Sequence, residues 1–160
     1  MTTVSSLRIV ALASCLAFST ADGASAADLT GLQAWAGKYP SDRIGGRQFF
    51  DHPGLRAEMR KSMGDQAYRD WQKIRGPEGP VVRAGDYVAA WRCQQHDCGD
   101  KNSTAIARLA KGDVVVCWQH APDQPARRWY IPGRAPVDER GEGCPQDAGE
   151  VGAAIRRLGL

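Results

Sequence analysis

The sequence has no apolar run of the roughly twenty residues that a membrane-spanning helix needs. It also has no internal repeat and no low-complexity segment. Neither sign of charge dominates, because 21 Lys and Arg residues stand among 18 Asp and Glu residues, for a net charge of +3. The mature chain is therefore not expected to carry an integral membrane segment. With no basic stripe and no matching motif, it is not expected to bind nucleic acid.

The N-terminus has the pattern of an export signal. Arg8 precedes the short apolar run Ile9–Phe18, and the small residues Ala24-Ser25-Ala26 follow it, so residues 1–26 are predicted to be a signal peptide. Residues 27–160 then form a single domain. An alternative is lipidation at Cys15, because Leu12-Ala13-Ser14-Cys15 resembles a lipobox. The apolar run continues past Cys15, which favours ordinary cleavage, and both routes place the protein outside the cytoplasm, in the periplasm.

Few cysteines remain after cleavage. They are Cys93, Cys98, Cys117 and Cys144, and an even number in an oxidising compartment predicts two disulfides. Three pairings are open, and the short spacing favours Cys93–Cys98, which leaves Cys117–Cys144. Loop entropy assigns roughly 2 kcal/mol to the first ring and roughly 3 to 4 kcal/mol to the second. The first is therefore expected to brace a loop, and the second to stabilise the fold.

Hydrophobic periodicity divides the chain into a helical part and a strand-rich part. Apolar residues recur every three or four positions over residues 53–75, which predicts two helices interrupted at Gly64-Asp65, with Asp65 capping the second. After Gly76 the period changes to two, and short joins favour an antiparallel meander. In the first strand Val88 and Ala90 are expected on one face and Ala89 on the other, and in the second Ala105 and Ala107 alternate with Thr104 and Ile106. We predict an α+β fold, in which an antiparallel β-sheet meander packs against short amphipathic helices. The expected strands are 87–92, 104–109, 113–118 and 128–131, with a hairpin turn at 111–112 and further short helices near 32–39 and 148–158.

The predicted join between the first two strands is a projecting loop. A disulfide between Cys93 and Cys98 would enclose Gln94, Gln95, His96 and Asp97, all of them polar. Such a tip is expected to face solvent or a partner rather than a core. Bracing would favour binding, because ordering each mobile side chain costs about 0.5 to 1.5 kcal/mol.

Cys93-Gln94-Gln95-His96-Asp97-Cys98 resembles the Cys-Lys-Pro-His-Asp-Cys signature of the Ivy-type inhibitors of vertebrate lysozyme, found in the periplasm of Gram-negative bacteria. Gly37-Lys38-Tyr39-Pro40 and Gly85-Asp86-Tyr87 are also similar. The resemblance implies a protein that inhibits c-type lysozyme and is not an enzyme. It implies that His96 enters the lysozyme cleft and bonds the two catalytic carboxylates, with Asp97 as a second contact and a Cys93–Cys98 brace. Gln94 and Gln95 depart from the signature, where they replace lysine and proline. Homodimers occur in the family.

Other interpretations of the same residues remain open. Vertebrate lysozymes are basic, so a net charge of +3 gives no long-range attraction, and the local acids Asp97 and Asp100 would have to compensate. The target is then alternatively another muramidase or a lytic transglycosylase, or the protein is a cell-envelope scaffold that does not inhibit. A zinc site from Cys93, Cys98, Cys117 and His120 has unusual spacing, and no metal or cofactor is expected. Trp91, Trp118 and Trp129 are expected in the core.

Overall fold

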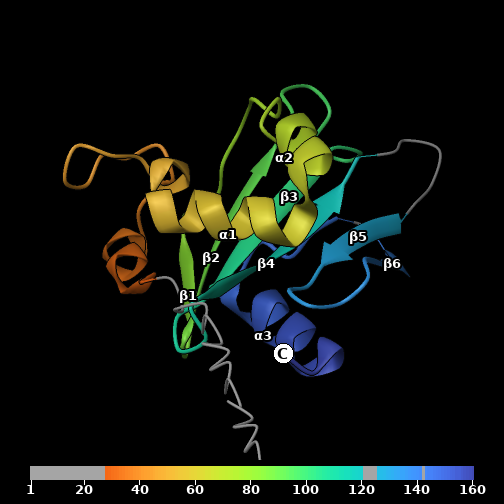
Figure 1. Ribbon diagram of the computed structural model, residues 1–160. Coiled ribbons are helices and arrows are strands. Elements are labelled where there is room, and N and C mark those ends of the chain that lie inside the picture. The colour runs from red at the N-terminus through yellow and green to blue at the C-terminus, as the bar shows by residue number, and fades with distance from the viewer. Residues whose placement is uncertain (1–27, 121–125, 142) are drawn as a thin grey trace, which may run out of the picture.

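The computed structural model describes residues 28–120, 126–141 and 143–160; the predicted signal peptide and Cys15 lie outside them. Six antiparallel strands form one sheet whose spatial order follows the chain, so the predicted meander is confirmed (Figure 1). None of the helices in these residues is long and apolar enough to cross a membrane. The strands are β1 (Val82–Ala84), β2 (Tyr87–Cys93), β3 (Asn102–Arg108), β4 (Asp113–Gln119), β5 (Ala126–Tyr130) and β6 (Val137–Arg140).

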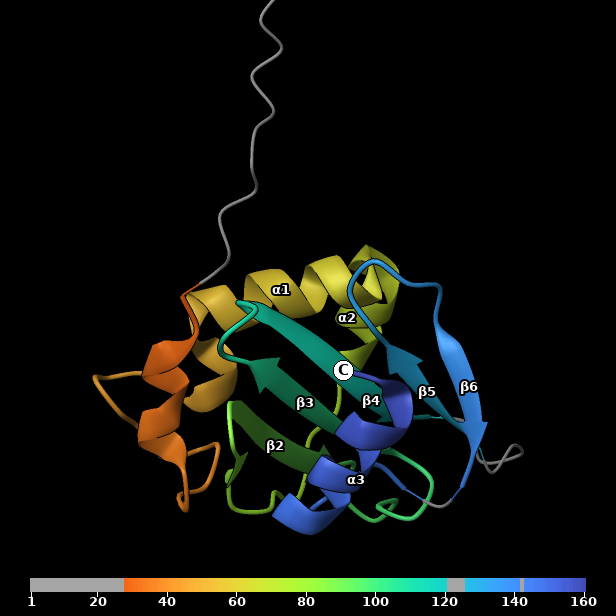
Figure 2. The ribbon, with the colours of Figure 1, turned by 90° about the horizontal axis from the view of Figure 1, so that it is seen from below.

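Helices cover both faces of the sheet (Figure 2). On one side lie α1 (Pro53–Met63) and α2 (Asp65–Trp71), with the 3-10 helices η1 (Thr30–Trp35) and η2 (Phe49–Asp51) in the same core. On the other side lies α3 (Ala148–Leu158). Strands buried on both faces favour continuous apolar sequence over alternation, which accounts for the run Val114-Val115-Val116 in β4.

The strand faces that the alternation predicts are confirmed. Val88 and Ala90 of β2 pack toward α1, whereas Ala89 lies in the core under α3. The hairpin turn also forms, since the Gly112 N–H donates to the Arg108 carbonyl oxygen (2.8 Å) and Gly112 has a φ of 65°. This positive φ is a conformation that glycine adopts without steric cost.

Four details of the sequence prediction were wrong. Residues 32–39 do not form one helix, because η1 ends at Trp35 and Tyr39 is 51% exposed. Asp65 does not cap α2; it is the first residue of that helix and pairs with Arg60 instead. The short strands β1 and β6 were missed, since three or four residues give no measurable alternation. The second predicted helix ends at Trp71, although Ile74 is buried beyond it.

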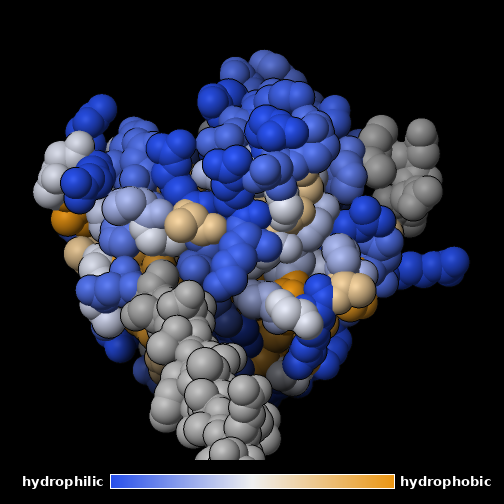
Figure 3. All heavy atoms as spheres, viewed as in Figure 1, coloured by the Kyte–Doolittle hydropathy of each residue, from blue (hydrophilic) through white to orange (hydrophobic). Residues whose placement is uncertain are grey.

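The face that carries α1 and α2 is mainly hydrophilic, with hydrophobic residues in small separate areas (Figure 3). Large apolar patches on soluble proteins mark protein or membrane contacts. On this face, recognition of a partner would depend more on shape and polar groups than on a broad apolar surface.

Candidate target-binding loop

The loop between β2 and β3 lies at the end of the sheet where β4 also ends. Cys93, Asn102 and Gln119 are neighbours across the three strands at this end, and the loop contacts the segment that follows α2. The disulfide Cys93–Cys98 closes its first part, as the spacing favours. Gln95 and His96 are exposed at the tip, so two of the predicted contact residues are available to a partner.

A tight turn fixes the backbone at His96. The Asp97 N–H donates to the Gln94 carbonyl oxygen (3.0 Å), and His96, the third residue of that turn, has a φ of 64°. A positive φ at this position is the type II pattern, and histidine is one of the few residues other than glycine that tolerate it. The turn therefore places the imidazole at the apex of the loop.

The second half of the loop is held through Asp97. Its carboxylate pairs with Lys101 (2.6 Å), and its carbonyl oxygen accepts a hydrogen bond from the Lys101 N–H (2.8 Å). The hydrogen bond that Lys101 donates to Asp97 raises the pKa of Lys101. Asp97 remains partly exposed at 28%. Its carboxylate therefore stabilises the free loop and remains within reach of a partner.

The segment after α2 supports the rear of the loop. The Gln95 N–H donates to the Arg75 carbonyl oxygen (2.8 Å), and the Arg75 N–H donates to Oε1 of Gln94 (3.1 Å). Gly76 allows this close approach, because a Cβ there would lie 2.3 Å from the Gln95 nitrogen. This support was not visible in the sequence, although Gly76 was identified as the end of the helical part.

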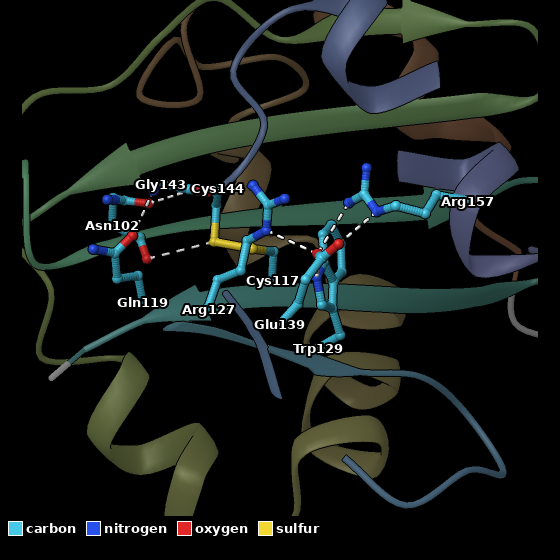
Figure 4. A network of polar contacts seen from close by, with 9 residues as sticks. All are labelled: Asn102, Cys117, Gln119, Arg127, Trp129, Glu139, Gly143, Cys144 and Arg157. Carbon is cyan, nitrogen blue, oxygen red and sulfur yellow. Dashed lines mark hydrogen bonds and ion pairs between the residues drawn. A yellow bond between two sulfur atoms is a disulfide. The ribbon is translucent and has the colours of Figure 1, made fainter. Parts of the chain in front are cut away.

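Two buried amides hold the other side of the loop (Figure 4). Asn102 donates to the Cys98 carbonyl oxygen (2.9 Å) and accepts from the Cys144 N–H (2.7 Å). Gln119 donates to the Gly99 carbonyl oxygen (2.9 Å) and accepts from the Gly143 N–H (2.6 Å). Both side chains are at least 96% buried. Each amide thus joins the loop to the segment that carries the second disulfide, Cys117–Cys144.

Comparison with known protein families decides which family the fold and loop represent. Residues 54–151 match the family model described as Inhibitor of vertebrate lysozyme (Ivy). The chain belongs to the Ivy family. No curated protein and no solved structure matches it. Membership of the Ivy family implies lysozyme inhibition as the function and lysozyme as the partner, and the matched range contains the whole loop.

The ion-pair network beside the second disulfide anchors the segment that the amides hold. Arg127 donates to the Gly143 carbonyl oxygen (2.8 Å) and to Glu139 (2.9 Å), which also accepts from Trp129 and Arg157 (Figure 4). Burial alone raises the pKa of Glu139, but the hydrogen bonds from these three residues lower it below its usual value. Glu139 therefore stays ionised and links β5, β6 and α3.

The cysteines, His120 and the tryptophans of the other interpretations all have defined surroundings in the structure. Cys93, Cys98 and Cys117 are all disulfide-bonded, so they are not the thiolate ligands that the zinc alternative needs. His120 stacks on Trp118 instead (4.2 Å between ring centroids). Trp118 and Trp129 are core residues as predicted, whereas Trp91 is only partly buried.

Gln95→Pro introduces the residue that the Ivy signature has at this position, and we expect it to lower the free energy of unfolding by about 1 to 3 kcal/mol. The proline ring would take the place of the N–H that donates to Arg75. Urea denaturation measures the loss. Gln95→Ala keeps the N–H and should stay within about 0.5 kcal/mol of the parent. An unchanged midpoint for the proline variant would contradict the importance of this contact.

Gln119→Leu is expected to lower the free energy of unfolding by about 2 kcal/mol, because it leaves the Gly99 carbonyl and the Gly143 N–H without partners. We also expect faster amide hydrogen exchange at residues 99–101. Gln146→Leu is the matched control, since that side chain is exposed in the same segment. Exchange in the loop that is equal in both variants would show that the amide does not hold it.

Proposed function

We propose that this protein is a periplasmic inhibitor of c-type lysozyme that inserts the Cys93–Cys98 loop into the catalytic cleft. His96 would engage the two catalytic carboxylates. The observation that carries the proposal is the exposed His96. A tight turn holds its backbone in the left-handed conformation at the apex of a loop that is supported on both sides. Membership of the Ivy family supports lysozyme as the partner.

The chemistry of the target suits an imidazole. A retaining glycosidase holds its two catalytic carboxyl groups about 5 Å apart. A protonated imidazole has an N–H donor on each side of a small ring, so it can bridge two such groups. Hydrogen bonds between charged partners are shorter and stronger than neutral ones. His96 would therefore act as a plug that bonds both carboxylates and excludes substrate.

The other residues of the loop are proposed to assist this contact. Asp97 would be the second contact to the cleft wall, with its carboxylate exchanging Lys101 for a donor of the target. Gln94 and Gln95 would contribute neutral hydrogen bonds where the Ivy signature has lysine and proline. No loop residue is assigned a catalytic role, and the protein is proposed to act by binding alone after export through residues 1–26.

A lytic transglycosylase is the second candidate target. The observation that favours it is charge, since the chain itself has a net charge of +3 and Gln94 stands where the Ivy signature has lysine. Attraction between a positively charged inhibitor and a basic vertebrate lysozyme is absent at long range. A bacterial enzyme without that strong positive charge would associate faster.

The proposed function is tested by titrating the oxidised mature protein into a lysis assay on purified peptidoglycan, with a c-type lysozyme and a lytic transglycosylase in parallel. Loss of lysozyme activity in proportion to added protein supports the proposal. Inhibition of the transglycosylase alone would identify that enzyme as the target in place of lysozyme. Saturable binding to peptidoglycan with both enzymes fully active would instead identify an envelope scaffold.

A further inference from the structure

The side chain of Arg92 is partly buried on the face of the sheet that carries α1 and α2. It extends from β2 against two aromatic rings that contact each other edge to face, with its guanidinium carbon 3.7 Å from the centroid of Trp71 and 4.8 Å from that of Phe50. Cation–π contacts of this kind stabilise a desolvated cation. They leave the in-plane N–H donors of the guanidinium to find other partners.

Those donors are mostly unused. Among the described residues, Arg92 donates one side-chain hydrogen bond, from Nη2 to the Trp71 carbonyl oxygen (3.0 Å). Its Nε is buried without a partner. No ion pair within the described ranges includes Arg92. Charges that are largely removed from water are normally paired, so this partly buried guanidinium would gain from an anion.

The charges around Arg92 also favour the binding of an anion. Burial, and then the positive charge of Arg75, lower the pKa of Arg92 to about 10, against the opposing influence of Glu78. The Glu78 carboxylate lies close by, and its Oε2 accepts from the Ser41 N–H (3.0 Å). Nη1 of Arg75 donates to the carbonyl oxygens of Gln72 and Ile74, so an anion bound between Arg75 and Arg92 would meet the remaining donors of Arg75 and relieve the repulsion.

A hollow of about 330 Å³ adjoins the two arginines. It is large enough for a small organic acid. Arg56 contributes a third guanidinium at its rim, and aromatic rings form part of its wall. The groups that would meet a ligand are the three guanidiniums and the rings of Phe50, Tyr68 and Trp71. The carboxylates of Asp51 and Glu78 line the same hollow, so the three arginines exceed the acids there by one charge.

We propose that this hollow binds a small carboxylate ligand, whose carboxylate pairs with the outer donors of Arg92 and with Arg75 and whose body packs on the aromatic wall. A planar guanidinium fork matches the two oxygens of a carboxylate better than it matches a single point charge. The Nε of Arg92 is covered, so the contact is made through the Nη atoms. The site is separate from the apex of the loop and does not depend on lysozyme inhibition.

The test is a titration of the oxidised mature protein with benzoate, acetate and inorganic phosphate, followed by NMR. Trp71 is the reporter, because its indole N–H donates to the buried Ser103 (2.8 Å) directly under the Arg92 stack. We expect saturable shifts with benzoate, weaker binding of acetate and no saturation with phosphate. Saturation by phosphate as strong as by benzoate would overturn the assignment to carboxylates.

Variants that leave the Arg92 stack intact make the test independent of folding. Arg75→Gln should weaken benzoate at least threefold, since it removes one cation. Glu78→Gln should tighten it at least threefold, since it removes a competing negative charge. Lys111→Gln, in the hairpin turn at the other end of the sheet, is the matched control and should change nothing. If Glu78→Gln leaves benzoate affinity unchanged, the bound carboxylate does not lie in the field of Arg75, Glu78 and Arg92, and the proposal fails. Absence of saturable shifts in the parent protein would also refute it.

Discussion

Replacing His96 with glycine should weaken inhibition of lysozyme at least 30-fold, which corresponds to about 2 kcal/mol and to the threshold for a binding hot spot. Glycine is the suitable replacement because His96 has a φ of 64°, a conformation that glycine adopts freely. The loop should therefore keep its shape while the imidazole is lost. Inhibition constants from the lysis assay measure the effect.

A companion variant separates the imidazole from the backbone. His96→Asn keeps a polar side chain that tolerates the left-handed conformation, but it cannot bridge two carboxylates as a cation. We expect it to inhibit as weakly as the glycine variant, and both should unfold within about 1 kcal/mol of the parent. Full inhibition by either variant would remove His96 from the mechanism, whatever the target.

Removing the second disulfide by Cys117→Ala with Cys144→Ala should lower the free energy of unfolding by about 3 to 4 kcal/mol. The bond closes a span of 27 residues, and both cysteines are buried. The Cys144 backbone N–H donates to Asn102, and alanine keeps this donor, but the disulfide no longer holds the segment that presents it, so the change should loosen the loop that Asn102 holds. Chemical denaturation measures the stability, and amide exchange in the loop measures the coupling.

The matched comparison is Cys93→Ser with Cys98→Ser, which opens a span of only five residues. We expect about 2 kcal/mol of lost stability, and a larger loss of binding free energy than of folding free energy, because this bond braces the loop. The variant without Cys117–Cys144 should therefore lose more stability, and the variant without Cys93–Cys98 should lose more inhibition. Equal stability and equal inhibition in the Cys93–Cys98 variant would contradict the brace.

The sequence predicted the features that depend on near neighbours in the chain. The alternation in β2 and β3 assigned residues to the two faces of the sheet, because side chains in a strand alternate. The spacing of the cysteines favoured the observed disulfides. The resemblance of residues 93–98 identified the Ivy family, which the family model confirms over residues 54–151.

Other features depended on contacts that the chain makes across long separations. No local pattern places α3 on the face opposite α1, since an amphipathic helix fits either side of a sheet that is apolar on both. The short strand β6 carries Asp138 and Glu139, which are stabilised by arginines of other elements and not by burial. The local periodicity of the sequence does not show which arginines pair with these two carboxylates.

The chain by itself therefore determined that a polar, disulfide-closed loop with His96 lies between two strands. Only the tertiary structure decided how that loop is held. Gln119 and Gly143 are 24 residues apart, and Gln95 is 20 residues from Arg75, yet each pair is joined by a hydrogen bond. Buried polar groups must find partners wherever the fold brings them, so the support of the loop is a property of the assembled sheet and helices.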